Sequence, residues 1–135
     1  MRRRWLVFCL IIPVMQQPKL KILVVDDEHL VRWSLRRYLE AEGFEAMEAE
    51  GGVLALEILE KEPIDVLITD LMMPEMDGLE LIRNALIVRP KLDILVITAN
   101  DSLNMIQSAE EAGAKRTFSK PIPFKELSGT IQALI

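Results

Sequence analysis

Short apolar runs alternate with amphipathic stretches along this chain. Apolar runs predict strands at residues 20–26, 64–70 and 93–98, and shorter strands are expected at residues 44–49 and 116–119. Between and after them, apolar positions recur at helical spacing and predict helices at residues 30–42, after Gly51-Gly52, after Gly78, at 102–112 and at 124–135. Strands and helices in regular alternation predict a doubly wound α/β fold built around a parallel sheet.

Local signals refine two of these helices. Gly43 follows the first helix and is expected to cap its C-terminal end. In the second helix, the apolar positions are Leu54, Ala55, Ile58 and Leu59, which mark its amphipathic face.

Two of the predicted strands stop abruptly on acidic residues. Asp70 ends the run Val66-Leu67-Ile68-Thr69, and Asp26 and Asp27 end the run Ile22-Leu23-Val24-Val25. Continuous apolar strands suit a parallel sheet that is covered on both faces, and in such sheets ligands bind beyond the carboxyl ends of the strands. A carboxylate at the end of a buried strand costs stability unless an opposite charge, a bound metal ion or a reaction partner accompanies it. We therefore expect these three acids to meet in a working site.

The residue types at this edge suit phosphoryl chemistry. The acids Asp26, Asp27 and Asp70 form an oxygen-rich, anionic set that suits Mg²⁺, and a bound cation leaves a carboxylate able to attack phosphorus. Thr98 and Lys120 end the fourth strand and follow the fifth, so their hydroxyl and ammonium groups reach the same edge. Taken singly, Thr98 is typical of a strand-end cap and Lys120 of a solvated side chain. Their convergence with the acids favours the functional interpretation.

Other polar residues near these strand ends are interpreted more simply. Glu28 and Glu75 are expected to be solvated loop acids. His29 is the only histidine, so it cannot build a histidine-rich metal site and is expected to be an exposed residue of the first helical turn. The lone Cys9 excludes an internal disulfide.

Length and charge narrow the possibilities further. The 135 residues suffice for one domain with a sizeable core. The net charge of -5 argues against a nucleic-acid surface in this domain, because phosphate binding draws on clustered Lys and Arg. Any DNA contact is therefore expected in another domain.

The N-terminus has a different character from the rest. Arg2, Arg3 and Arg4 precede the apolar run of residues 5–12, as in a signal peptide, but this run is too short to cross a bilayer, which takes about 20 residues. We expect an N-terminal extension at residues 1–18 and a folded domain at 19–135. Residues 1–14 are interpreted as an upstream start or a poorly packed extension, with a weak membrane-associating tail as the alternative. The expectation for the domain itself is no membrane contact.

Four motifs stand in order along residues 20–135: V-V-D-D-E, T-D-L-M-M-P-E-M-D-G, I-T-A-N and S-K-P. With these motifs and their spacing, the chain resembles the receiver domain of bacterial two-component response regulators. The resemblance implies a CheY-like or flavodoxin-like fold, with a five-stranded parallel sheet in the order 2-1-3-4-5 and five flanking helices. It also implies a cytoplasmic signalling domain and not an enzyme.

The resemblance further implies a role for each motif residue. Asp70 would accept a phosphoryl group from a sensor histidine kinase. Mg²⁺ would be bound by Asp26, Asp27, Asp70 and the backbone carbonyl of Met72, directly or through water. Thr98 would move to bond the phosphoryl group, and Lys120 would pair with it. Phosphorylation would then switch an output or the formation of a homodimer, and the output would regulate transcription.

One position departs from the family pattern. Three residues before Lys120, receiver domains usually carry a Tyr or Phe whose rotamer reports activation, whereas this chain has Thr117. The resemblance therefore does not extend the aromatic part of the switch to this chain, and any dimerisation of the isolated domain is expected to be weak. The next residue, Phe118, is expected in the core by strand alternation.

Two other classes of protein share this fold or this chemistry. A Mg²⁺-dependent phosphatase of the haloacid dehalogenase type carries a D-x-D motif after its first strand, whereas this chain has the adjacent acids Asp26 and Asp27. A nucleotide- or flavin-binding module carries a Gly-rich phosphate-binding loop after its first strand, whereas this chain continues with D-D-E-H-L. Turnover of a phosphate ester or a copurifying cofactor would reveal either class.

Overall fold

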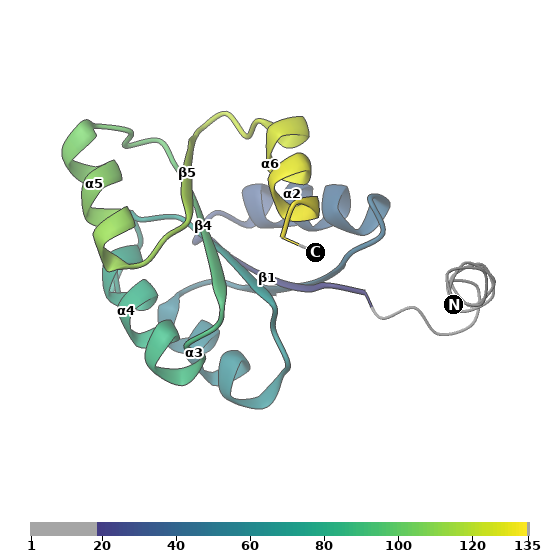
Figure 1. Ribbon diagram of the computed structural model, residues 1–135, viewed down its shortest axis with the longest axis horizontal. Coiled ribbons are helices and arrows are strands. Elements are labelled where there is room, and N and C mark those ends of the chain that lie inside the picture. The colour runs from purple at the N-terminus through teal and green to yellow at the C-terminus, as the bar shows by residue number, and fades with distance from the viewer. Residues whose placement is uncertain (1–18, 135) are drawn as a thin grey trace, which may run out of the picture.

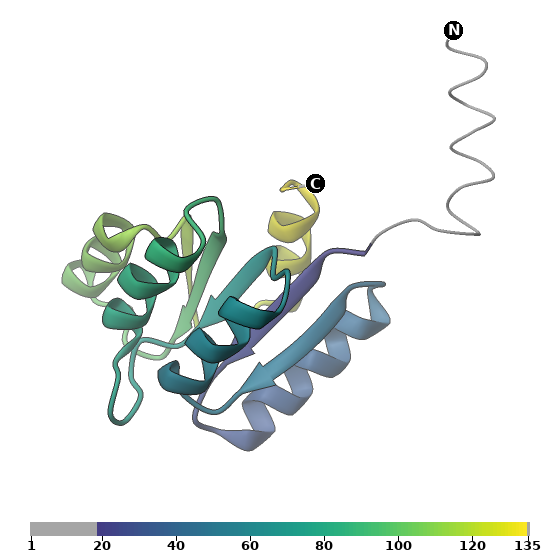
Figure 2. The same ribbon diagram turned by 90° about the horizontal axis from the view of Figure 1, so that it is seen from below.

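The computed structural model describes residues 19–134, and its centre is a parallel sheet. The strands run in the order β2-β1-β3-β4-β5, and every neighbouring pair is parallel. Figure 2 shows them fanned in this order, with β2 and β5 at the two edges. This confirms the predicted sheet and its order. The strand bounds are β1 Lys21–Val25, β2 Glu45–Ala49, β3 Val66–Thr69, β4 Asp93–Thr98 and β5 Arg116–Ser119.

Helices cover both faces of the sheet. Figure 1 shows α2 and α6 on one face and α3, α4 and α5 on the other. Strand alternation divides the core in the same way, because Leu23 and Val25 pack toward α3 and α4, whereas Ile22 and Val24 pack toward α2 and α6. The helix bounds are α2 His29–Ala41, α3 Gly52–Lys61, α4 Gly78–Val88, α5 Leu103–Ala112 and α6 Phe124–Gln132.

Most local predictions are confirmed. His29 is exposed at the start of α2, and Phe118 is buried in the core that α2 and α6 cover. Gly43 follows α2 with a φ of 94°, a left-handed conformation that glycine adopts without strain. Across residues 19–134, no helix has the length and apolar character that crossing a bilayer requires. The expected extension at residues 1–18, Cys9 included, lies outside the described residues.

The amphipathic helix expected after Gly51-Gly52 is confirmed as α3. Its buried face is centred on Gly52, Ala55 and Leu59, whereas Leu54 lies to one side of that line and is 40% exposed. One predicted helix end differs from the structure. The last helix ends at Gln132 and not at residue 135. Periodicity locates a helix face only to within one side chain, and helix ends are the least constrained part of such a pattern.

The turn after β3 brings α4 close to the strand end. Asp77 caps α4, and its Oδ1 accepts a hydrogen bond from the Glu80 backbone N–H at 2.9 Å. Gly78 begins the helix directly against the backbone of Asp70 and Leu71. A Cβ on residue 78 would collide with the Asp70 carbonyl oxygen and would lie 2.6 Å from the Leu71 Cα. Only glycine therefore allows α4 to start in this position.

Gly78→Ala is expected to lower the free energy of unfolding by about 1–3 kcal/mol, because the backbone at Asp70 and Leu71 must shift to admit the methyl group. Urea unfolding followed by circular dichroism measures this change. Gly129→Ala is the matched control, since a Cβ there meets no atom within 4 Å. Alanine should stabilise α6 at that position by about 0.5–1 kcal/mol. Equal stability of the two variants would contradict the account of Gly78.

Candidate functional site

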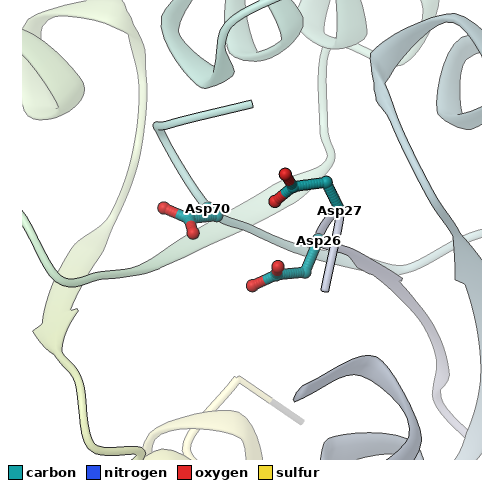
Figure 3. Close-up of side chains that lie close together, drawn as sticks. All are labelled: Asp26, Asp27 and Asp70. Atoms are coloured by element: carbon teal, nitrogen blue, oxygen red, sulfur yellow. The ribbon is translucent and has the colours of Figure 1, made fainter. Parts of the chain in front are cut away.

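Three carboxylates gather at the carboxyl edge of the sheet. Asp26 and Asp27 directly follow β1, and Asp70 directly follows the neighbouring strand β3 (Figure 3). Each offers an oxygen, and these oxygens lie within 4.8 Å of one another. Asp26 and Asp70 are only 4% and 6% exposed, whereas Asp27 is exposed. We refer to these residues as the acidic cluster, which is buried on one side and open to solvent on the other.

Lys120 supplies the positive charge that this cluster needs. Its Nζ donates to Asp70 Oδ2 at 2.8 Å and to Asp26 Oδ2 at 3.0 Å. Burial lowers the pKa of Lys120, but the hydrogen bonds to these two carboxylates outweigh burial and leave the pKa raised. Lys120 is therefore a protonated ammonium group shared by two buried acids.

The charge balance is less favourable for Asp26. Burial raises the pKa of its carboxyl group, and the Glu28 backbone N–H and Lys120 only partly oppose this effect. The contacts between Lys120 and the two carboxylates favour the charged form of Lys120. The charged form of Asp26 stays disfavoured, because Asp26 shares this one ammonium group with Asp70. The cluster therefore carries negative charge that a cation could neutralise.

Backbone groups fix the orientation of Asp70. Its Oδ1 accepts from the backbone N–H groups of Leu71 at 2.6 Å and Met72 at 3.2 Å, while Oδ2 accepts from Lys120. The hydroxyl of Thr69 donates to the Asp70 carbonyl oxygen at 2.8 Å. These bonds hold the carboxylate at the strand end in a single orientation, as a nucleophile requires.

Thr98 lies at the same edge, but its hydroxyl is bonded elsewhere. It ends β4, is fully buried, and its Oγ1 accepts from the Asn100 backbone N–H at 3.2 Å. Within residues 19–134, this hydroxyl makes no hydrogen bond to the acidic cluster. The Lys120 backbone N–H donates to the Thr98 carbonyl oxygen at 2.9 Å, which joins the ends of β4 and β5.

The remaining predicted positions are placed as follows. Met72 follows Asp70 by two residues, with its side chain 58% exposed. Thr117 lies on β5, and its buried hydroxyl has no hydrogen-bond partner in the part of the chain that the structure describes. Glu28 and Glu75 are exposed, as expected of loop acids.

Sequence reasoning did not identify Arg32 as part of this site. Its Nη1 donates to the Asp26 carbonyl oxygen at 2.7 Å, and its Nε donates to Glu48 Oε1 at 3.2 Å. Arg32 thereby ties the loop after β1 to β2. An arginine in an amphipathic helix gives no sequence signal for such a contact.

The arrangement suits two kinds of chemistry. Three carboxylates at this spacing provide hard oxygen ligands for a divalent cation such as Mg²⁺. A carboxylate held beside an ammonium group can also act as a nucleophile toward an anionic group, because the ammonium balances the incoming charge.

Comparison with known proteins gives relatives of one kind. Response regulator MprA from Mycobacterium leprae is 41% identical over 116 residues, which cover 86% of this chain and 51% of that protein. The chain thus spans about half the length of the MprA regulators it matches. Sporulation initiation phosphotransferase F from Bacillus subtilis is 33% identical over 112 residues, which cover 83% of this chain and 90% of that protein.

Solved structures agree with these relatives. A CheY-like response regulator receiver domain from Methanospirillum hungatei superposes with a TM-score of 0.83 at 29% identity, covering 87% of this chain and 94% of that one. Chemotaxis protein CheY4 from Vibrio cholerae gives a TM-score of 0.82 at 29% identity, covering 87% and 100%. The family described as the response regulator receiver domain matches residues 22–132. Since that match takes in all of the described strands and helices apart from the first residue of β1, the chain belongs to the response regulator receiver domain family.

Proposed function

We propose that this domain acts in the cytoplasm and accepts a phosphoryl group on Asp70 from a sensor histidine kinase, in a Mg²⁺-dependent reaction. The observation that carries the proposal is the position of Lys120 Nζ, within 3.0 Å of both Asp26 and Asp70 in an otherwise acidic cluster. Membership of the receiver family favours this reaction over a phosphatase or a cofactor-binding module. The domain acts here as a signalling module and not as an enzyme.

The transfer balances as a displacement at phosphorus. An Asp70 carboxylate oxygen forms the new bond to phosphorus, the bond between phosphorus and the kinase imidazole nitrogen breaks, and that nitrogen takes up a proton. The backbone N–H groups of Leu71 and Met72 and the Lys120 ammonium orient the attacking carboxylate. Lys120 also balances charge on the phosphoryl oxygens.

The acidic cluster and the Met72 backbone carbonyl would hold the cation. The fit is supported by the oxygen ligands within 4.8 Å of one another and by the excess negative charge beside Asp26. Bound Mg²⁺ supplies neutralisation of the phosphoryl oxygens. Asp27 is exposed and leaves the cluster open to solvent, which permits a cation with part of its water shell to enter.

The response to phosphorylation would pass through Thr98 and Lys120. Thr98 ends β4 and Lys120 directly follows β5, and both connect to the loops that lead into α5 and α6. We also propose an output in transcription regulation, with any DNA contact made outside this domain, because a net charge of -5 does not favour binding to nucleic-acid phosphates. A weak, phosphorylation-dependent homodimer would accompany this change.

Asp70→Asn is expected to abolish modification by acetyl phosphate and binding of beryllofluoride, because an amide is not a nucleophile at phosphorus. Intact-protein mass spectrometry and fluorine NMR measure the two events, with and without Mg²⁺. Asp65→Asn is the matched control, since this exposed acid directly precedes β3, at the amino end of the strand that Asp70 follows. Undiminished modification of Asp70→Asn, or modification without a divalent cation, would contradict the proposal.

Asp26→Asn is expected to weaken Mg²⁺ binding and, in metal-free protein, to raise the free energy of unfolding, because an amide carries no buried charge. The gain should depend on pH. Folding raises the pKa of Asp26 above 3.8, so ionisation costs stability as the pH rises through the raised value. The stability difference between variant and wild type should therefore grow from pH 4 to pH 7. Urea unfolding in EDTA measures it, and a difference independent of pH would contradict this assignment.

Lys120→Ala is expected to leave the fold intact and to permit some modification of Asp70, but to weaken the conformational response, since the charge that links the phosphoryl group to the end of β5 is lost. Amide NMR spectra with and without beryllofluoride measure the response. Lys115→Ala serves as the control, because Lys115 directly precedes β5 and pairs with Asp93 at the amino ends of the strands, away from the acidic cluster. A Lys120→Ala spectrum that changes as fully as that of wild type would disprove the coupling role.

A further inference from the structure

The loop between β4 and α5, residues 99–102, is tied to the ends of both β4 and β5. On one side, the Asn100 backbone N–H donates to Thr98 Oγ1 at 3.2 Å. On the other, Ser119 Oγ donates to Asp101 Oδ2 at 3.0 Å. Figure 1 shows β4, β5 and α5 as neighbours, so the two bonds connect adjacent parts of the fold.

The same loop leads directly into α5. Ser102 is the N-cap of this helix, and its Oγ accepts from the Met105 backbone N–H at 3.3 Å. A displacement of the loop therefore displaces the first turn of α5. Leu103, in that turn, is 84% exposed, so a change there is presented to solvent and to any partner.

The Thr98 hydroxyl is the link between this loop and the phosphoryl site. It is fully buried and now accepts from Asn100. Under the proposed function, on which this inference rests, Thr98 moves to bond a phosphoryl group on Asp70. The Asn100 N–H then loses its acceptor unless the loop follows Thr98. A contact that anchors the loop elsewhere must oppose that movement.

We propose that the Ser119–Asp101 hydrogen bond is that anchor, and that these two residues are positioning residues that hold the loop in its unphosphorylated arrangement. Ser119 immediately precedes Lys120, whose backbone is bonded to Thr98 and whose side chain is bonded to the acidic cluster. The anchor therefore stands on the part of β5 that is fixed most firmly to the site. Among the described residues, the buried hydroxyl of Thr117 on the same strand makes no hydrogen bond, whereas the Ser119 hydroxyl joins β5 to this loop.

The direction of the effect follows from linkage. A contact made in only one of two states favours that state by its own free energy. Removal of the anchor should therefore favour the activated state and tighten beryllofluoride binding in the presence of Mg²⁺. For a single hydrogen bond to a carboxylate at an exposed site, we expect a gain of about two- to tenfold in affinity.

A double-mutant cycle on the full chain tests the anchor. Beryllofluoride affinity is measured with Mg²⁺ by fluorine NMR for wild type, Ser119→Ala, Asp101→Ala and the double variant. Each single variant should bind more tightly, and Ser119→Ala should have no further effect once Asp101 is alanine. This pattern differs from a simple loss of the Asp101 charge, because Ser119→Ala changes no charge. Thr130→Ala, which removes a hydroxyl bonded to Arg116, is the matched control and should bind as wild type does.

A second measurement reports position and not only affinity. In metal-free Ser119→Ala, the amide resonances of Asn100 and Met105 should move toward their positions in beryllofluoride-bound wild type. Affinity equal to or weaker than wild type, additive effects of the two substitutions, or unmoved resonances would each overturn the anchor. If wild type binds beryllofluoride no better than Asp70→Asn, the proposed function itself fails, and the two failures are thereby distinguished.

Discussion

One ammonium group shared by two buried carboxylates is the interaction on which the site depends. Lys120 follows β5, whereas Asp26 and Asp70 follow β1 and β3, so the ion pairs reach across the end of β4, where Thr98 lies. No local segment of the chain can form this contact by itself. The site is complete only when four strands of the sheet are aligned, and any group that binds the carboxylates acts on all four strand ends.

Burial of the carboxylates makes the site costly in stability, because one shared ammonium group offsets it only in part. The raised pKa of Asp26 means that its burial is incompletely offset, although Lys120 is held firmly by the same contacts. Replacement of such groups by neutral ones commonly stabilises a protein at the expense of its activity. The strain is electrostatic and local, since the strands that lead to the site are packed with apolar residues on both faces.

The sequence predicted what depends on local pattern. The alternation of short strands with amphipathic helices located every strand of the described sheet, and acids at two strand ends were enough to predict that Asp26, Asp27 and Asp70 would meet. The contacts of Arg32 and the bond between Ser119 and Asp101 were not predicted, because each joins side chains from separate elements whose exact rotation no local pattern specifies. The exposed Leu54 has the same origin, since a small rotation of α3 decides which apolar residue at the edge of its face is covered.

The pairing of β4 with β5 limits how the chain can change in length during evolution. Thr98 stands opposite Ser119, and Lys120 follows at once. One residue inserted within β5 would exchange the faces of Thr117 and Phe118 and carry the ammonium group away from its partners. Insertions between α5 and β5, at residues 113–115, would lie at the amino ends of the strands and leave this alignment intact. Length variation among homologous chains should therefore concentrate at the amino edge of the sheet, while the spacing from Phe118 to Lys120 stays constant.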